Sequence, residues 1–320
     1  MHPTERPTQK QTILAFASIY LIWGSTYLAI RYAVESLPAF TMAGARFVFA
    51  GSALFIWALA KGEPAPKSSQ WVPASIGGCL LLLIGNGGIV WAAHMLPSGF
   101  IALLVGAEPM YLVLMDWFRP GGRRPRLTTL AGLVLGFGGL VLLLAPRSSQ
   151  LPTSRSWLGV FSVLLASIAW AAGSLYSRSS RLPDSARLST GMQMQVGGVL
   201  LLIVGVAAGE WRLIHFPMGT WKSWIAFSYL LTFGSFIGFT AYVWLLRTTT
   251  AARVATYAYI NPLIAVFLGW LVANEPVNLR VILSTVIITL SVALILDNRR
   301  SLDSRIPKML GAQNTQQRTP

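Results

Sequence analysis

Two polar residues stand directly before prolines inside long apolar stretches of this chain, as Glu108-Pro109 and Asn261-Pro262. Proline removes a backbone N–H and frees the carbonyl one turn earlier, and in lipid that carbonyl must find another partner. Interrupted helices at matching positions of two halves are typical of substrate sites in membrane transporters. A structural kink bridged by neighbouring helices is the alternative. The occurrence in both halves favours helix breaks at Pro109 and Pro262 that line a site.

Two charged side chains, Arg46 and Glu108, are expected deepest within the apolar stretches. Counted from Pro38 and Pro97 at the outer face, Arg46 lies about 12 Å deep and Glu108 about 16 Å deep, at about 1.5 Å per helical residue. The similar depth allows a buried ion pair that fixes one helix against another. Alternatively, Glu108 binds a proton or the amine of a substrate, and Arg46 faces a carboxylate. The sequence leaves both alternatives open.

Aromatic and amide side chains in the same stretches offer further contacts for a ligand. Trp23 and Trp170 occupy matching positions in the two halves, and an indole offers both a ring for stacking and a polar edge. Asn86 is an amide that needs partners when buried, either across a helix interface or in a cavity. We predict a substrate site that contains Trp23, Tyr27, Asn86, Glu108, Trp170, Tyr257 and Asn261.

These residues lie in a chain that repeats itself. Displacement by 147 residues places Trp23 on Trp170, Arg31 on Arg178, Gly44 on Gly191 and Gly51 on Gly198. Displacement by 153 residues gives further identities: Ile84 with Ile237, Gly85 with Gly238, Val90 with Val243, Trp91 with Trp244, Pro109 with Pro262, Val113 with Val266 and Trp117 with Trp270. If each half crosses a membrane five times, the halves must be inverted relative to each other, as in many secondary transporters.

The composition is that of a membrane protein. Charged residues make up 11% and hydrophobic residues 54% of the chain, and its mean hydropathy is +0.60. A bilayer core needs about 20 apolar residues as a helix, and solid apolar runs argue against an outer-membrane barrel. We predict an all-α integral membrane protein with ten transmembrane helices in two inverted five-helix repeats, at 12–32, 38–60, 70–94, 97–118, 127–145, 156–178, 185–209, 221–246, 250–273 and 279–297.

The two repeats are expected at 12–145 and 156–297, between polar segments at 1–11 and 298–320. With a cytoplasmic N-terminus, the predicted inner segments contain 18 Lys and Arg residues and the outer ones contain 6. Positive charge concentrates in the cytoplasmic loops of membrane proteins, so both termini are predicted to be cytoplasmic. This bias and the anionic lipid headgroups also explain the net charge of +15, so nucleic acid is not an expected partner.

Enzyme and cofactor signatures are absent from the sequence. It contains no G-x-x-x-x-G-K-[ST] phosphate loop and no H-E-x-x-H, G-x-S-x-G or kinase motif, so neither ATP drive nor enzymatic activity is expected. Cys79 is the single cysteine, which excludes a disulfide framework and a Cys/His metal cluster. We expect no cofactor and no metal.

Three short segments of the chain form a recognisable set, at 22–27, 42–47 and 257–263, the last followed by the turn Glu275-Pro276. They resemble the EamA-domain members of the drug/metabolite transporter superfamily, especially its YedA-like bacterial inner-membrane proteins. The resemblance covers about residues 12–297 and implies two EamA repeats that export metabolites or drugs through a central cavity. The first repeat departs from the family at 121–124, where an acidic residue is common, whereas the second retains Glu275.

We therefore expect a secondary-active exporter of small metabolites, with amino acids among the candidates, or of drugs. It would work by alternating access, with proton coupling through Glu108 as one hypothesis. A channel-like permease or a non-transporting membrane scaffold is the alternative. The expected partners are a small-molecule substrate and membrane lipids, in a monomer or homodimer located in the inner (plasma) membrane.

Overall fold

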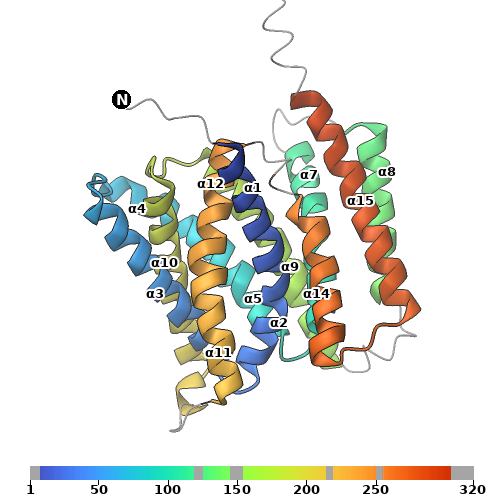
Figure 1. The fold of residues 1–320 in the computed structure, drawn as a ribbon, viewed down its shortest axis with the longest axis horizontal. Helices are drawn as coiled ribbons and strands as arrows, with labels where there is room; N and C mark the ends of the chain where they lie inside the picture. The colour runs from blue at the N-terminus through green and yellow to red at the C-terminus, as the bar shows by residue number, and fades with distance from the viewer. Residues whose placement is uncertain are drawn as a thin grey trace, which may run out of the picture.

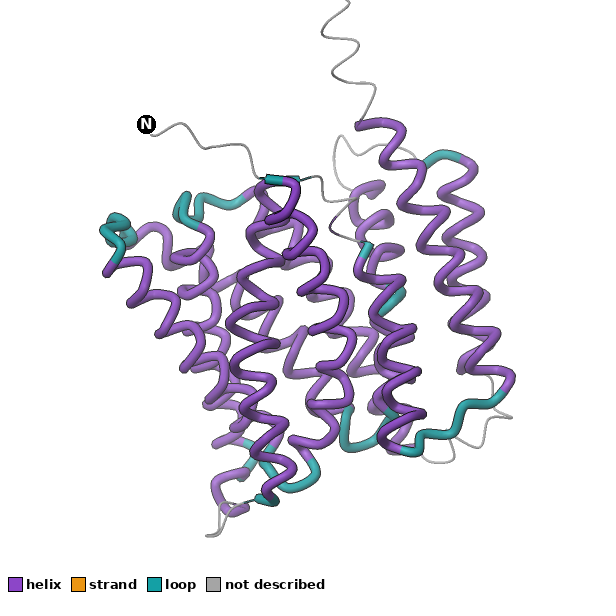
Figure 2. The backbone as a smooth tube through the Cα atoms, in the orientation of Figure 1, coloured by secondary structure: helices purple, strands orange, loops and turns teal. Residues whose placement is uncertain are grey.

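The apolar stretches of the chain form helices. A computed structural model describes residues 8–118, 125–144, 154–213, 219–249, 254 and 256–303. Every regular element within these ranges is a helix (Figure 2). Large hydrophobic side chains fill the core and also cover much of the exposed helix surface, as expected for helices that face lipid. The predicted all-α class is confirmed.

The first half of the chain combines continuous and interrupted helices. α1, η1 and α2 form one continuous helix, and so do α4, η2 and α5. The elements are α1 (Gln9–Ala17), η1 (Ser18–Ile22), α2 (Trp23–Val34), α3 (Ala39–Ala60), α4 (Ser68–Gly78), η2 (Cys79–Asn86), α5 (Gly87–Ala92), α6 (Ser98–Val105), α7 (Glu108–Phe118) and α8 (Leu127–Leu144).

The second half begins with two long uninterrupted helices. α11, η4 and α12 follow as one continuous helix. The elements are α9 (Ser154–Ser179), α10 (Ala186–Ala207), η3 (Glu210–Leu213), α11 (Trp221–Tyr229), η4 (Leu230–Phe239), α12 (Thr240–Thr248), α14 (Tyr257–Ala273) and α15 (Leu279–Asp303).

Many of these helices have the length and apolarity of membrane spans. Within the described ranges, 8 helices are long and apolar enough to cross a membrane. Two shorter apolar helices, Ile260–Ala273 and Leu279–Ile295, lie near the end of the described chain. A span of about 20 apolar residues matches the bilayer core. The protein is therefore a multi-pass membrane protein.

Three of the long helices contain π-helical segments, which no sequence pattern predicted. These segments are η1, η2 and η4. π-helical turns are rare and frequently lie at functional sites. η2 ends at Asn86 and η4 ends at Phe239, and these two positions correspond at the displacement of 153 residues. The irregularity thus occurs at the same place in both halves.

α3 and α10 pack closely because glycines face each other across their contact. A Cβ at Gly44 would lie 2.8 Å from the carbonyl oxygen of Gly198, and a Cβ at Gly51 would lie 2.9 Å from that of Gly191. Gly44 and Gly191 correspond in the repeat, and so do Gly51 and Gly198. If each glycine is replaced by its counterpart in the other half, the Gly44–Gly198 contact becomes the Gly51–Gly191 contact. The order of the contacts also requires α3 and α10 to run antiparallel.

α8 and α15 form a second close pair at one side of the bundle (Figure 1). The Ser291 hydroxyl donates to the Gly132 carbonyl oxygen at 2.7 Å. A Cβ at Gly139 would lie 2.9 Å from side-chain atoms of Ile287 and Ile288. Small residues permit such close approach between membrane helices. Gly132 and Gly139 of α8 therefore serve packing within this chain.

Candidate functional site

A cavity lies at the centre of the bundle and is lined by helices of both halves. Its volume is about 70 Å³, well below the roughly 300–1,000 Å³ of typical small-molecule sites. A metabolite therefore fits only if some lining side chains move. Six of the predicted substrate residues line the cavity: Trp23, Tyr27, Asn86, Glu108, Trp170 and Tyr257.

Glu108 is the acidic residue of this cavity, and a helix break positions it. α6 ends at Val105, the chain turns at Gly106 and Ala107, and α7 begins at Glu108. Pro109 is thus in the first turn of α7, where a missing N–H costs no helical hydrogen bond. Glu108 is 3% exposed, and its carboxylate accepts a hydrogen bond from the Tyr257 hydroxyl at 2.6 Å.

The second polar–proline pair behaves differently from the prediction. α14 continues through Pro262, so a helix break at Pro262 is not present. The Pro262 ring lies against Gly106, where an added Cβ would be 3.0 Å from it. α14 begins at Tyr257, so Pro262 is its sixth residue and lies beyond the first turn; its missing N–H leaves the Ala258 carbonyl without its helical donor.

Asn261 does not line the cavity, although it is buried. With its amide oriented so that the nitrogen faces helix 9–34, Asn261 donates to the carbonyl oxygens of Tyr20 at 3.1 Å and Ile19 at 3.3 Å. Both acceptors belong to the π-helical segment η1. Asn261 therefore ties α14 to an irregular part of the first long helix.

Arg46 lines the cavity as a buried cation, with 2% of its surface exposed. Its Nη2 donates to Asn86 Oδ1 at 2.6 Å, and its guanidinium carbon lies 4.5 Å from the centre of the Phe47 ring. Arg46 Nε has no hydrogen-bond partner. Among the described residues, no ion pair joins Arg46 and Glu108. The structural ion pair that was one of the two alternatives is therefore not formed in this structure.

Aromatic rings form one wall of the cavity. Trp23 meets Trp170 edge-on at 5.8 Å and Tyr257 edge-on at 5.5 Å between ring centres. Tyr242 packs behind them, 4.9 Å from Trp23, and Phe239 lies 5.8 Å from Trp170. The matched tryptophans thus contact each other in the middle of an aromatic cluster.

Phe239 and Tyr242 are functional candidates that the sequence analysis missed. Their repeat counterparts are Asn86 and Ile89, so comparing the two halves gave no matching aromatic residue. Both lie in an apolar stretch, where a ring is most often packing. Only the three-dimensional proximity to Trp23 and Trp170 identifies them.

Glu275 joins helices of both halves at the far end of the bundle, where α2 ends. Its carboxylate accepts from the Ser98 N–H at 2.8 Å, the Ser98 hydroxyl at 2.7 Å and the Gly99 N–H at 3.0 Å, and it forms an ion pair with Arg31. It thereby caps the N-terminus of α6, as side-chain acceptors do at helix starts. The sequence predicted a turn here; Glu275 also connects α14 with α2 and α6.

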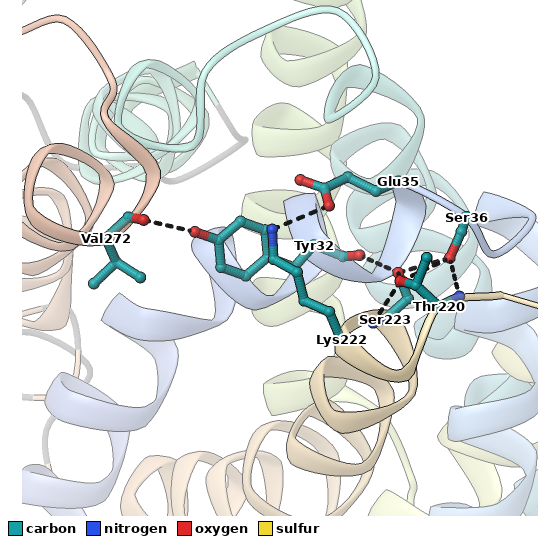
Figure 3. A network of polar contacts seen from close by, with 7 residues as sticks. All are labelled: Tyr32, Glu35, Ser36, Thr220, Lys222, Ser223 and Val272. Atoms are coloured by element: carbon teal, nitrogen blue, oxygen red, sulfur yellow. Dashed lines mark hydrogen bonds and ion pairs between the residues drawn. The ribbon is translucent and has the colours of Figure 1, made fainter.

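A second polar network ties the far end together (Figure 3). Tyr32 donates to the Val272 carbonyl oxygen at 3.0 Å, which connects α2 with α14. Lys222 lies 3.5 Å from the centre of the Tyr32 ring and 3.2 Å from the Glu35 carboxylate. The Ser223 hydroxyl donates to the Tyr32 carbonyl oxygen at 2.6 Å. α2 is therefore held to α11 and α14 at this end.

The comparison with protein families decides what kind of protein this arrangement belongs to. The model of the EamA-like transporter family matches residues 10–145 and again residues 157–297. The chain belongs to this family. The resemblance noted in segments of the sequence is thereby confirmed, and this EamA chain is a membrane transporter.

Relatives and a solved structure agree with this assignment. The "uncharacterized inner membrane transporter YedA" of Escherichia coli is 35% identical over 265 residues, covering 82% of this chain and 83% of that protein. The "uncharacterized transporter YoaV" of Bacillus subtilis is 23% identical over 284 residues, which cover 87% of this chain and 94% of that protein. A solved crystal structure shares the fold, with 18% identity, a TM-score of 0.65 and coverage of 92% of this chain and 99% of that one. The relatives are transporters, which favours transport over enzymatic activity.

Proposed function

We propose that the protein is a secondary-active exporter of small metabolites or drugs that works by alternating access. The observation that carries the proposal is one central cavity, lined from both halves, that holds Arg46 and Glu108. The alternating unit would be ten spans in two inverted repeats, 12–145 and 156–297. A monomer or homodimer would suffice, since one chain supplies the whole cavity lining.

The inverted arrangement is supported by the crossing of α3 and α10. The contacts of Gly44 with Gly198 and of Gly51 with Gly191 exchange under the repeat, and the helices are antiparallel there. Two repeats related in this way have opposite orientations in the membrane. Alternating access needs this arrangement, because the two repeats can then exchange roles when the site opens to the other side. The family match at 10–145 and 157–297 agrees with the same division.

The proposed orientation places both termini in the cytoplasm. The predicted inner segments hold 18 Lys and Arg residues against 6 in the outer ones, and this bias sets orientation in membrane proteins. The name of the Escherichia coli relative, an inner membrane transporter, supports the inner membrane as the location of this chain. The far end of the bundle then faces the outside of the cell.

The proposed substrates carry a carboxylate, and amino acids are the first candidates. Within the part of the chain that the structure describes, the buried guanidinium of Arg46 has no carboxylate partner and its Nε has no hydrogen-bond partner, so an anion of the substrate would satisfy it. Glu108, on the same cavity, would bind an ammonium group. The rings of Trp23 and Trp170 offer faces for an apolar side chain or a cation.

Glu108 is also the candidate for proton coupling, because it is the buried carboxylate of the cavity. The Tyr257 hydroxyl donates to it, and an amide oxygen at the same position would keep that hydrogen bond. Glu108→Gln therefore removes the titrating group with little change of shape. A pH profile of transport that stays unchanged in Glu108→Gln would exclude the proton role and leave facilitated diffusion.

The decisive experiment is a flux assay on purified protein in liposomes, with a panel of amino acids and cationic drugs, with and without a pH gradient. We expect saturable uptake and counterflow for at least one carboxylate-bearing compound. Arg46→Gln should reduce that flux about ten-fold or more, the loss expected for one charge-assisted hydrogen bond. Glu63→Gln is the control, since Glu63 pairs with Arg187 at 2.6 Å away from the cavity.

Two outcomes would contradict the proposal. Flux without saturation or counterflow would indicate a channel-like permease. Absence of flux with every compound and gradient would favour a non-transporting scaffold.

A further inference from the structure

A second cavity lies nearer the N-terminal end of the bundle. Its volume is about 340 Å³, several times that of the central cavity. Hydroxyl and amide groups of Ser174, Ser177 and Gln193 line it, from the end of α9 and the beginning of α10. Tyr242 of α12 forms its inner wall. Two charged residues of opposite sign, Arg178 and Asp184, also line it, so the lining favours a small polar molecule.

The two cavities occupy equivalent places in the two halves. Five lining residues of the second cavity are repeat counterparts of central-cavity residues. The pairs are Ser174 with Tyr27, Ser177 with Ile30, Gln193 with Arg46, Tyr242 with Ile89 and Leu81 with Gly234. The same exchange of halves relates the glycine contacts of α3 and α10. The second cavity is thus the inverted counterpart of the central one.

A thin layer of side chains separates the two cavities. Tyr242 is 3% exposed and shares a hydrogen bond of 3.0 Å with Ser174, both of which line the second cavity. On its other side, Tyr242 contacts the rings of Trp23 at 4.9 Å and Trp170 at 6.1 Å, which line the central cavity. Moving the Tyr242 ring aside would join the two spaces.

The helices on both sides of this layer are irregular. η4 ends at Phe239, three residues before Tyr242, and η2 contains Leu81 of the second cavity. A π-helical segment can shift by one residue or revert to α-helix, and each change rotates the side chains that follow it. The backbone beside the layer is therefore suited to move the Tyr242 ring.

Three charged residues of the far-end contacts have uncharged repeat counterparts. Glu275, Lys222 and Glu35 take part in the far-end contacts. Their repeat counterparts are Gly122, Ser69 and Leu182. The repeat therefore does not reproduce these far-end contacts at the N-terminal end, where the larger cavity lies and where Arg187 forms a different ion pair, with Glu63 at 2.6 Å.

We propose that the second cavity is the access chamber through which a small polar, anionic molecule reaches the central cavity, and that Tyr242 with Ser174 is the gate between them. The inference rests on the proposed transport function and specifies its path. An anion would pass from the hydroxyls and amide of the chamber to the guanidinium of Arg46, so that it keeps polar partners along the path. In the proposed orientation the chamber faces the cytoplasm.

The test uses thiol labelling, which the single native cysteine makes possible. In a Cys79→Ser background, one cysteine at a time is introduced and exposed to a charged, membrane-impermeant thiol reagent in vesicles of either orientation. Ser177→Cys and Ser180→Cys probe the chamber, and Thr26→Cys probes the central cavity. Lys10→Cys marks the N-terminal side, and Ser291→Cys, at a fully buried position of α15, is the unreactive control.

We expect both chamber cysteines to react from the same side as Lys10→Cys. From that side Thr26→Cys should react slowly, and Tyr242→Ala should accelerate it at least about ten-fold. Tyr242→Phe keeps the ring and removes the hydroxyl, so it should accelerate the reaction about five-fold, as expected when one ordinary hydrogen bond no longer holds the closed state. Chamber cysteines that do not react from that side would overturn the inference, and so would a Thr26→Cys rate that neither Tyr242 variant changes.

Labelling and transport can fail independently. The labelling rates need no substrate, so the expected pattern without flux of any compound would support the gate and contradict the exporter. Saturable flux together with unreactive chamber cysteines would support the exporter and reject this path.

Discussion

Replacing Glu275 by alanine should destabilise the protein much more than replacing Glu35, an exposed charge at the same end. Glu275 is 6% exposed and accepts hydrogen bonds from Ser98 and Gly99, in addition to its ion pair with Arg31. Without it, the first N–H groups of α6 lose their acceptor in a buried place. The effect should appear in the free energy of unfolding.

The magnitude follows from the separate contacts. Loss of a helix N-cap costs about 0.5–2 kcal/mol, and each hydrogen bond to a charged group contributes about 1.5–3 kcal/mol. Arg31 is 33% exposed, so water screens its ion pair, which contributes about 1 kcal/mol or less. Because neighbouring contacts are not additive, we expect a total of about 3–5 kcal/mol. At about 2 °C per kcal/mol for a chain of this size, Tm should fall by about 6–10 °C.

The assay is thermal unfolding of purified protein in detergent at one scan rate, since irreversible unfolding makes absolute values depend on the rate. Glu275→Gln keeps an acceptor oxygen and should lose about half as much. Glu35→Ala is the control, because Glu35 is 43% exposed and pairs with Lys222 at 3.2 Å, an exposed pair expected to contribute less than about 1 kcal/mol. If Glu275→Ala melts within about 1 °C of Glu35→Ala, the capping argument is wrong.

Three further exchanges test the packing and the site. Gly51→Ala should lower Tm, because the added Cβ would lie 2.8 Å from Met194. Gly138→Ala has open space around the added Cβ and should raise Tm slightly, since alanine favours the helix over glycine. Equal shifts of Tm in the two variants would contradict the described crossing of α3 and α10. Asn261→Leu should cost about 1–3 kcal/mol in thermal unfolding without changing substrate affinity; a large change in affinity would place Asn261 in the site. Arg46→Met should leave Tm unchanged or raise it while abolishing flux, and a drop in Tm with normal flux would refute a binding role.

The helices and most of the cavity-lining residues could be predicted from the sequence, because a lipid surrounding restricts both the backbone and the placement of polar side chains. Apolar runs of span length become helices, and polar or charged residues within them avoid lipid. Arg46, Asn86 and Glu108 therefore had to face the interior, and they line one cavity. Depth alone did not decide whether Arg46 and Glu108 touch, since depth does not give the rotation of each helix.

The sequence repeat predicted side-chain positions poorly where the helices of the two halves begin at different points. Asn261 corresponds to Glu108 in sequence, but α14 starts before it while α7 starts at Glu108, so their side chains point to different surroundings. Pro262 stays within its helix for the same reason. The π-helical segments and Tyr242, the proposed gate residue, had no sequence signal, because both depend on contacts between helices that are distant along the chain.

The contacts of Arg46 do not suggest that this residue stabilises the fold. A buried cation without a carboxylate is unfavourable, because among the described residues only the Asn86 hydrogen bond and the Phe47 ring offset its desolvation. An ion pair with Glu108, on the same cavity, would have been a remedy, yet the structure does not form it. A site kept in this state gains most from a ligand that brings its own anion. Binding should therefore raise Tm in proportion to RT ln(1 + [L]/Kd), and this ligand-induced shift should vanish in Arg46→Met, even though that variant is at least as stable when empty.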